Sequence, residues 1–161
     1  MVVGRETTPA GGAGMNNELD SMGPIDYLVV EFPAGGPTGE AFPLLVDLVD
    51  RGLIRILDLA FVAKEQDGSV RGLSIADLDK DAKQNLAVFE GASSGLLGQD
   101  DFEESGAALE PGRSGAILVY ENVWAAPFAT AMRHAGTQLV STGRIPVQGI
   151  LAALDAAEAG R

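Results

Sequence analysis

The chain has 161 residues, of which 46% are hydrophobic and 21% are charged, a composition typical of one globular domain with a real core. It carries 11 Lys and Arg against 23 Asp and Glu, and the resulting charge of −12 disfavours nucleic acid and anionic membranes as partners. The absence of cysteine excludes disulfides, thiolate metal sites and cysteine nucleophiles. No secretory signal pattern opens the chain, so we expect a cytoplasmic protein.

The first 23 residues are rich in Gly, Thr, Asn and acidic side chains, which predicts a flexible leader before a single folded domain at 24–161. The domain opens with a predicted strand at 25–32, where β-branched and aromatic residues dominate. A helix is expected from about 40 to 51, with Gly52 just past its end. Its apolar residues recur at helical spacing: Phe42, Leu45, Val46 and Val49.

The next part of the chain alternates strands with turn and capping signals. A long, largely apolar strand is predicted at 53–64, and Asp67-Gly68 is a hairpin signal followed by a short run at 69–72. Ser74-Ile75-Ala76-Asp77 has the form of a capping box, which predicts a helix to about Phe89.

Five further elements are expected after a loose Gly/Ser segment. They are a short acidic helix capped by Asp100 or Asp101, a strand at 115–121, a helix at 125–135, a strand at 137–142 and a terminal helix. Pro146 suits the first turn of that last helix, because its missing N–H has no partner to lose there. Its buried stripe is predicted to comprise Val147, Ile150, Leu151 and Leu154.

Two halves of the chain share one pattern. Pro43 precedes Gly52 by nine residues, and Pro127 precedes Gly136 by nine, each within a strand, helix, glycine and strand. Because a crossover helix joins neighbouring parallel strands, two such βαβ units predict an α+β fold with a ferredoxin-like antiparallel sheet and helices on one face. The predicted parts are a first half at 24–64, an insertion with a hairpin and helices at 65–113, a second half at 114–145 and a C-terminal helix at 146–161.

Three motifs carry a resemblance to an uncharacterised bacterial family over about residues 24 to 145. They are Asp50-Arg51-Gly52-Leu53-Ile54, the run 58–62 with its Asp67-Gly68 hairpin, and Asp101-Phe102 leading to Leu109-Glu110-Pro111-Gly112. The chain resembles the actinobacterial domain of unknown function numbered sixty-three twenty-five. More distantly it resembles a wider family, number twelve sixty-nine, of often membrane-associated proteins. The resemblance supplies no catalytic residue to carry over.

Members of that wider family often carry a long apolar hairpin that could enter a membrane. The matching stretch at 86–98, LAVFEGASSGLLG, contains Glu90 and falls short of the roughly 20 apolar residues that a span requires. We therefore expect no transmembrane segment.

The stretch at 29–42, VVEFPAGGPTGEAF, has the order strand, glycine-rich loop and helix in which phosphate sites are built. No Lys-Ser or Lys-Thr pair follows Gly39, and Glu31 and Glu40 would repel a phosphate. The corresponding loop of the second half is shorter. We interpret this one as an inserted loop that is either a plain surface loop or a contact with another copy of the protein, with ligand binding as the alternative. The candidate residues are Gly35, Gly36, Pro37 and Thr38.

Other groups of polar residues imitate sites without completing them. Asp77, Asp79 and Asp81 have the spacing of the first ligands of an EF-hand, but the Gly and Glu that the loop needs are missing. The acids at 100–104 are typical of a solvated helix start. His134, the only histidine, lies near the expected end of a helix, where a cation complements the helix dipole, and no motif ties a nucleophile to it.

The sequence therefore predicts no catalytic residue, no cofactor and no metal site. It favours a non-enzymatic structural or interaction protein that forms homo-oligomers or binds a protein partner, because an open sheet face or edge is a common surface for assembly. The alternative is a small-ligand-binding or sensor module that uses the cleft between the sheet and the insertion. Tyr27, Tyr120, Trp124 and Phe128 are expected to be core or interface aromatics.

Overall fold

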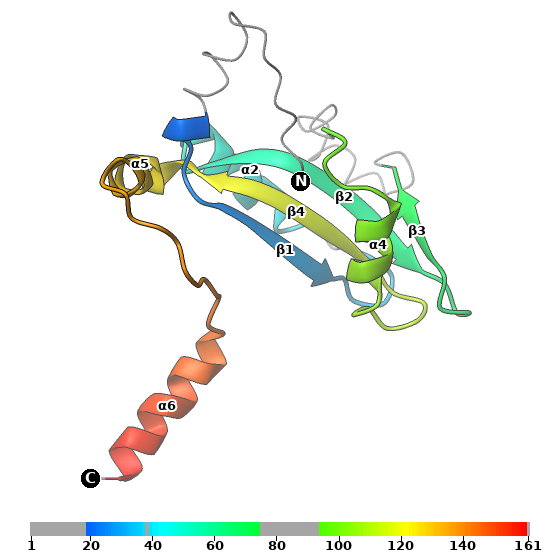
Figure 1. Cartoon of the computed structure of the whole chain (residues 1–161). Coiled ribbons are helices and arrows are strands. Elements are labelled where there is room, and N and C mark those ends of the chain that lie inside the picture. Colours follow the sequence, from blue (N-terminus) through cyan, green and yellow to red (C-terminus); the bar gives the residue numbers. More distant parts are fainter. Residues whose placement is uncertain (1–18, 38, 75–93, 161) are drawn as a thin grey trace, which may run out of the picture. The chain divides into compact units, whose positions relative to one another are not determined.

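The computed structural model describes residues 19–37, 39–74 and 94–160 (Figure 1). The chain divides into two compact units, Met1–Ala131 and Met132–Arg161, and each is described by itself. The helix expected from Ser74 to about Phe89 falls almost entirely outside the described residues.

The first unit is built on a four-stranded antiparallel sheet in the order β1-β4-β2-β3 (Figure 1). Its strands are β1 (Ile25–Glu31), β2 (Ile54–Lys64), β3 (Val70–Leu73) and β4 (Ser114–Asn122). The strands expected at 25–32, 53–64, 69–72 and 115–121 are thus confirmed to within a residue or two. Strands β4 and β2 are central, so β1 and β3 form the edges.

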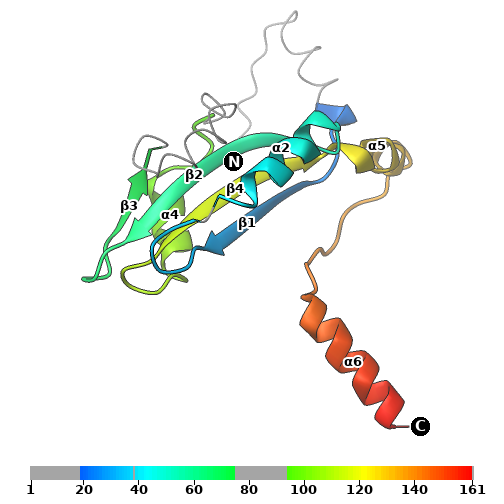
Figure 2. The same cartoon turned by 180° about the vertical axis from the view of Figure 1, so that it is seen from behind.

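One face of the sheet is covered by α2 (Phe42–Asp50), as Figure 2 shows from behind. Phe61 of β2 is 2% exposed, and its ring centroid lies 6.4 Å from those of both Phe32 and Phe42. Gly52 follows the helix at φ +70°, a left-handed conformation that a glycine adopts without strain. We call this side of the sheet the α2 face.

The opposite face is covered in part by α4 (Gln99–Gly106), and we call it the α4 face. Val62, Leu109 and Ile117 form its core, with Phe102 of α4 packed against them. Gly72 of β3 makes room for this helix, because an added Cβ would lie 3.3 Å from the Phe102 ring.

Helix α4, which belongs to the predicted insertion at 65–113, thus covers the face opposite to α2. The reason is visible in β4, where consecutive apolar residues from Ala116 to Val119 point to alternate faces. Such a strand needs apolar cover on both sides.

The prediction of a strand at Thr137–Thr142 is wrong, because residues 137–146 form neither helix nor strand. The second half of the chain continues from β4 through η3 (Val123–Ala125) into α5 (Ala126–His134), and then lacks its closing strand. A strand forms only where a neighbour offers hydrogen-bond partners, and β3 supplies the fourth strand of this sheet instead. The ferredoxin-like duplication is therefore not confirmed.

The hairpin between β2 and β3 forms as predicted, with Gly68 at φ +90°. The Asp67 carboxylate accepts hydrogen bonds from the Ser69 hydroxyl at 2.6 Å and from its backbone N–H at 2.9 Å. Bonds to the charged form lower the pKa of Asp67 below its ordinary value.

The second unit contains the terminal helix α6 (Val147–Ala159), which begins directly after Pro146. The carbonyl of Pro146 accepts from the N–H groups of Gly149 and Ile150, so the proline precedes the first turn rather than lying within it. Within residues 132–160 no element covers the apolar stripe of this helix, so its expected burial is not observed there.

Replacing Phe61 by Ala should lower the free energy of unfolding by about 3–5 kcal/mol, because the site lies between two aromatic rings and cannot collapse fully. Urea denaturation followed by circular dichroism measures the change. The control is Leu44→Ala on the exposed side of α2, where we expect less than about 0.5 kcal/mol. Equal effects of the two substitutions would refute this account of the core.

Candidate functional site

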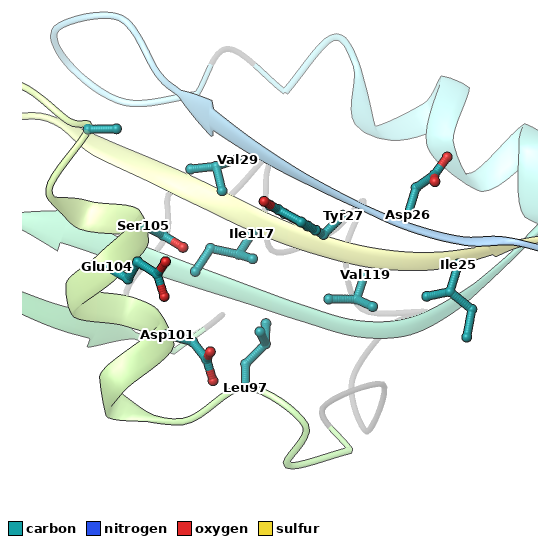
Figure 3. A pocket seen from close by; sticks show the side chains of 11 residues that line it. Ile25, Asp26, Tyr27, Val29, Leu97, Asp101, Glu104, Ser105, Ile117 and Val119 are labelled. Carbon is teal, nitrogen blue, oxygen red and sulfur yellow. The ribbon is translucent and has the colours of Figure 1, made fainter. Parts of the chain in front are cut away.

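An open groove of about 530 Å³ lies between β1, β4 and α4 in the first unit (Figure 3). We call it the β1 groove. Its floor and walls are formed by Ile25, Asp26, Tyr27, Val29, Leu97, Asp101, Glu104, Ser105, Ala108, Ile117 and Val119.

The floor is apolar because of the register between β1 and β4. Tyr27 lies opposite Val119 and Val29 lies opposite Ile117, and residues directly opposite in an antiparallel pair share a face. Helix α4 packs mainly on the β3 and β2 side of that face and leaves the β1 side uncovered. Tyr27 is therefore 72% exposed and Ile25 50% exposed.

The rim of the groove is acidic. Asp101 and Glu104 lie three residues apart on α4, so both project to the same side of the helix. Asp101 Oδ2 accepts the Gly98 N–H at 2.9 Å, which caps the helix start and fixes that carboxylate. Asp26 also lines the groove, but its side chain points to the opposite face of the sheet (Figure 3), where its carboxylate accepts from Asn122 Nδ2 at 3.0 Å.

A buried carboxylate positions one wall of the groove. A register shift between Ile56 and Asp58 turns Asp58 to the α4 face, where it is 1% exposed. Its Oδ2 accepts the N–H of Leu97 at 3.0 Å and its Oδ1 accepts the N–H of Leu59 at 2.9 Å. Asp58 thereby ties the segment before α4, and with it Leu97, to the sheet.

Glu31 at the end of β1 and Glu121 near the end of β4 both have structural partners. Glu31 accepts the N–H of Glu110 at 2.7 Å. Glu121 is buried and accepts the N–H of Gly23 at 2.8 Å and the Arg55 Nε at 2.9 Å. Both carboxylates thus satisfy backbone N–H groups from distant parts of the chain.

The predicted interaction loop lies away from the β1 groove. Gly35 and Gly36 have φ of +95° and +97° and line a second, shallower hollow of about 410 Å³, with Lys64, Arg71 and Arg113 around it. Thr38 lies outside the described residues, and Pro37 is not among the lining residues. The role of this loop in contact with another protein remains a prediction.

The cations around this second hollow are already engaged. Lys64 Nζ donates to the carbonyl of Leu109 at 2.9 Å, and Arg71 Nε lies 2.6 Å from Glu65 Oε1. Arg113 faces the carboxylate of Glu110 at 3.8 Å. These contacts reduce what the hollow can offer an anion, so it ranks below the β1 groove as a candidate site.

The remaining sequence candidates are distributed as follows. Asp77, Asp79 and Asp81 lie outside the described residues. In the described ranges no group of three or more acidic or histidine side chains could hold a metal ion. His134 lies in the last turn of α5 beside Arg133. Of the four aromatics, Tyr120 is buried, whereas Tyr27, Trp124 and Phe128 are exposed.

No helix in the described part of the chain is long and apolar enough to cross a membrane.

Removing the Asp58 carboxylate by Asp58→Ala should lower the free energy of unfolding by about 1–3 kcal/mol, because two partly buried N–H groups lose their acceptor. Hydrogen exchange at the Leu97 amide should accelerate at the same time. The control is Asp67→Ala, which removes an exposed carboxylate that accepts one backbone N–H and one hydroxyl of Ser69, and it should leave exchange at Leu97 unchanged. Unaltered exchange at Leu97 in Asp58→Ala would contradict the positioning role.

The chain was compared with protein families, curated proteins and solved structures. No curated protein and no solved structure matches the chain. A family model described as "Family of unknown function (DUF6325)" matches residues 21–160, which include all the strands and α2, α4, α5 and α6. The more distant likeness to family twelve sixty-nine stays a prediction. The chain therefore belongs to the family of unknown function DUF6325.

Proposed function

We propose that this protein is a non-enzymatic interaction domain that associates, with a second copy or with a protein partner, through the β1 groove and the outer edge of β1. The observation that carries the proposal is Tyr27, an aromatic side chain 72% exposed on an edge strand. Sheet proteins usually protect such edges, because unpaired backbone groups and apolar side chains there invite another chain.

The size and composition of the groove support this role. Tyr27 and Ile25 are exposed, and with the half-buried Val29 and Val119 they give a partner a continuous apolar surface above the buried Ile117. Truncating an aromatic residue that is a hot spot at the centre of an interface costs about 2 kcal/mol or more of binding free energy. Burial of Tyr27 is therefore the expected anchor of the contact.

The chemistry of the groove supports binding rather than catalysis. Its polar groups are carboxylates and the hydroxyls of Ser105 and Tyr27, with no His, Lys or Arg among the described lining residues. A hydroxyl nucleophile needs a base beside it, and a developing oxyanion needs a donor or a cation. His134 lies on α5 and is not among the residues that line the groove.

Tyr27→Lys should abolish the association, because it replaces the aromatic anchor by a solvated charge. The measurement is light scattering across the micromolar range, together with affinity capture of a partner on the immobilised full chain. Val30→Lys is the matched control, since it makes the same change in charge at a residue of the same strand that is 44% exposed and points to the α2 face.

The control should keep the wild-type behaviour. A wild-type protein that stays monomeric at every concentration and retains no partner would sink the proposal, as would an association that Tyr27→Lys leaves intact.

A small-ligand-binding or sensor role is the second candidate, favoured by the volume of the groove. About 530 Å³ falls within the range of roughly 300–1,000 Å³ that is usual for ligand pockets. The apolar floor and acidic rim fit a ligand with an apolar body and a positive group. This role predicts a rise in Tm with an organic amine that Tyr27→Lys removes and Val30→Lys retains, in a protein that remains monomeric.

A further inference from the structure

We infer that the β1 groove binds an extended, arginine- or lysine-bearing segment of a partner protein, which adds to the sheet as a strand beside β1. This inference rests on the proposed function and names the partner. Three observations support it: the direction of the backbone groups of β1, the side chains that share that direction, and the charge around them.

The backbone of β1 alternates between its neighbour and its outer edge. Asn122 donates to the carbonyl of Pro24 at 2.8 Å and Phe32 donates to the carbonyl of Ser114 at 2.8 Å, so the even-numbered residues of β1 bond to β4. By the alternation of an antiparallel ladder, the odd-numbered residues Ile25, Tyr27, Val29 and Glu31 direct their N–H and C=O groups outward. These groups can pair with one further strand.

The outward-directed residues are the same ones whose side chains form the groove floor. Tyr27, Val29 and Ile25 face the α4 side, opposite Val119, Ile117 and Glu121 of β4. In an antiparallel addition, the partner residues that bond to them place their own side chains on that face as well. The backbone contact with β1 and the side-chain contact with the groove therefore involve the same set of every-second residues of the partner strand.

The charge of the groove selects among possible partner strands. The carboxylates of Asp101 and Glu104 face it from α4, and no basic residue lines it in the described part of the chain. A second copy would bring another chain of formal charge −12 and the same acidic rim against it. A basic segment meets the opposite sign, which favours its encounter and disfavours self-association.

Arginine and lysine fit the apolar floor of the groove as well as its charge. Their aliphatic stems can cover the exposed ring of Tyr27 while the charged head reaches the carboxylates of Asp101 and Glu104 on α4. A guanidinium over the Tyr27 ring adds a cation–π contact. Residues of the partner that point to the other face of the sheet can be of many types.

The test uses the full chain and a fluorescent peptide of alternating arginine and threonine, with binding followed by anisotropy. We expect this peptide to bind and its alternating glutamate and threonine counterpart to fail. Methylation of the arginine backbone amides should abolish binding, because those amides face β1. Methylation of the threonine backbone amides should be tolerated. This peptide has the same charge and the same number of methyl groups as the peptide methylated at the arginine amides.

Protein variants test the two contacts separately. Tyr27→Lys should weaken binding of the arginine peptide about tenfold or more, and Val30→Lys should not change it. Glu104→Gln should weaken binding up to about fivefold, as expected for an exposed ion pair. Its control is Glu103→Gln, an equally acidic neighbour on α4 that does not line the groove.

Equal binding to all four variants, or equal tolerance of both methylation patterns, would reduce the effect to attraction between a polycation and an acidic protein and would overturn the inference. If no peptide binds while the chain self-associates through Tyr27, the inference falls and the proposed function stands. If no peptide binds and the chain neither self-associates nor retains a partner, the inference and the proposed function both fall.

Discussion

Strand β4 pairs with β1 along one edge and with β2 along the other, so the sheet is complete only when residues 114–122 insert between two strands that precede them in the chain. This insertion determines which groups are left for other molecules. With β4 and β2 in the centre, β1 becomes an edge, and its outer backbone groups and the Tyr27 side chain have no described strand beside them. The apolar residues of β4 point to both faces and require α2 on one and α4 on the other.

The cover on the α4 face is incomplete, and the incomplete part is the β1 groove. Helix α4 is held by Phe102 over Gly72 at the β3 side, and by the Asp58 carboxylate that anchors the preceding segment at Leu97. Both anchors lie away from β1. A short helix fixed at that side cannot also reach Ile25 and Tyr27, so their exposure follows from where the helix is attached.

Local signals in the sequence predicted most elements, and pairing between distant elements accounts for the errors. The apolar periodicity of α2, its glycine stop and the Asp67-Gly68 hairpin depend on neighbours in the chain, and each is found where predicted. The shared spacing of Pro43 with Gly52 and of Pro127 with Gly136 describes how two helices start and stop. It carries no information on which strands pair, and the inferred strand at 137–142 does not form.

The same limit applies to the candidate site. Gly35 and Gly36 were predicted as an interaction loop because the order of strand, loop and helix is a local pattern. The β1 groove depends instead on the register between β1 and β4 and on where α4 is attached. The sequence predicts β1 as a strand, in which Tyr27 and Val29 point to one face, but it does not show whether a helix covers that face. The acids of α4, predicted only as a solvated helix start, acquire a second role because the fold sets Asp101 and Glu104 above an apolar floor.

An exposed edge strand with an aromatic side chain is normally a hazard, since it can pair with any other extended chain. The acidic rim changes which chains can approach. It places charge of the same sign as the protein itself beside the apolar floor, which disfavours the approach of a second copy to this surface relative to a basic segment. Exposed carboxylates supply little binding energy, but they act on encounter and on the choice of partner. In the proposed role the edge can therefore stay open and still discriminate between partners, because the β1 backbone and Tyr27 would supply the affinity and α4 the selectivity.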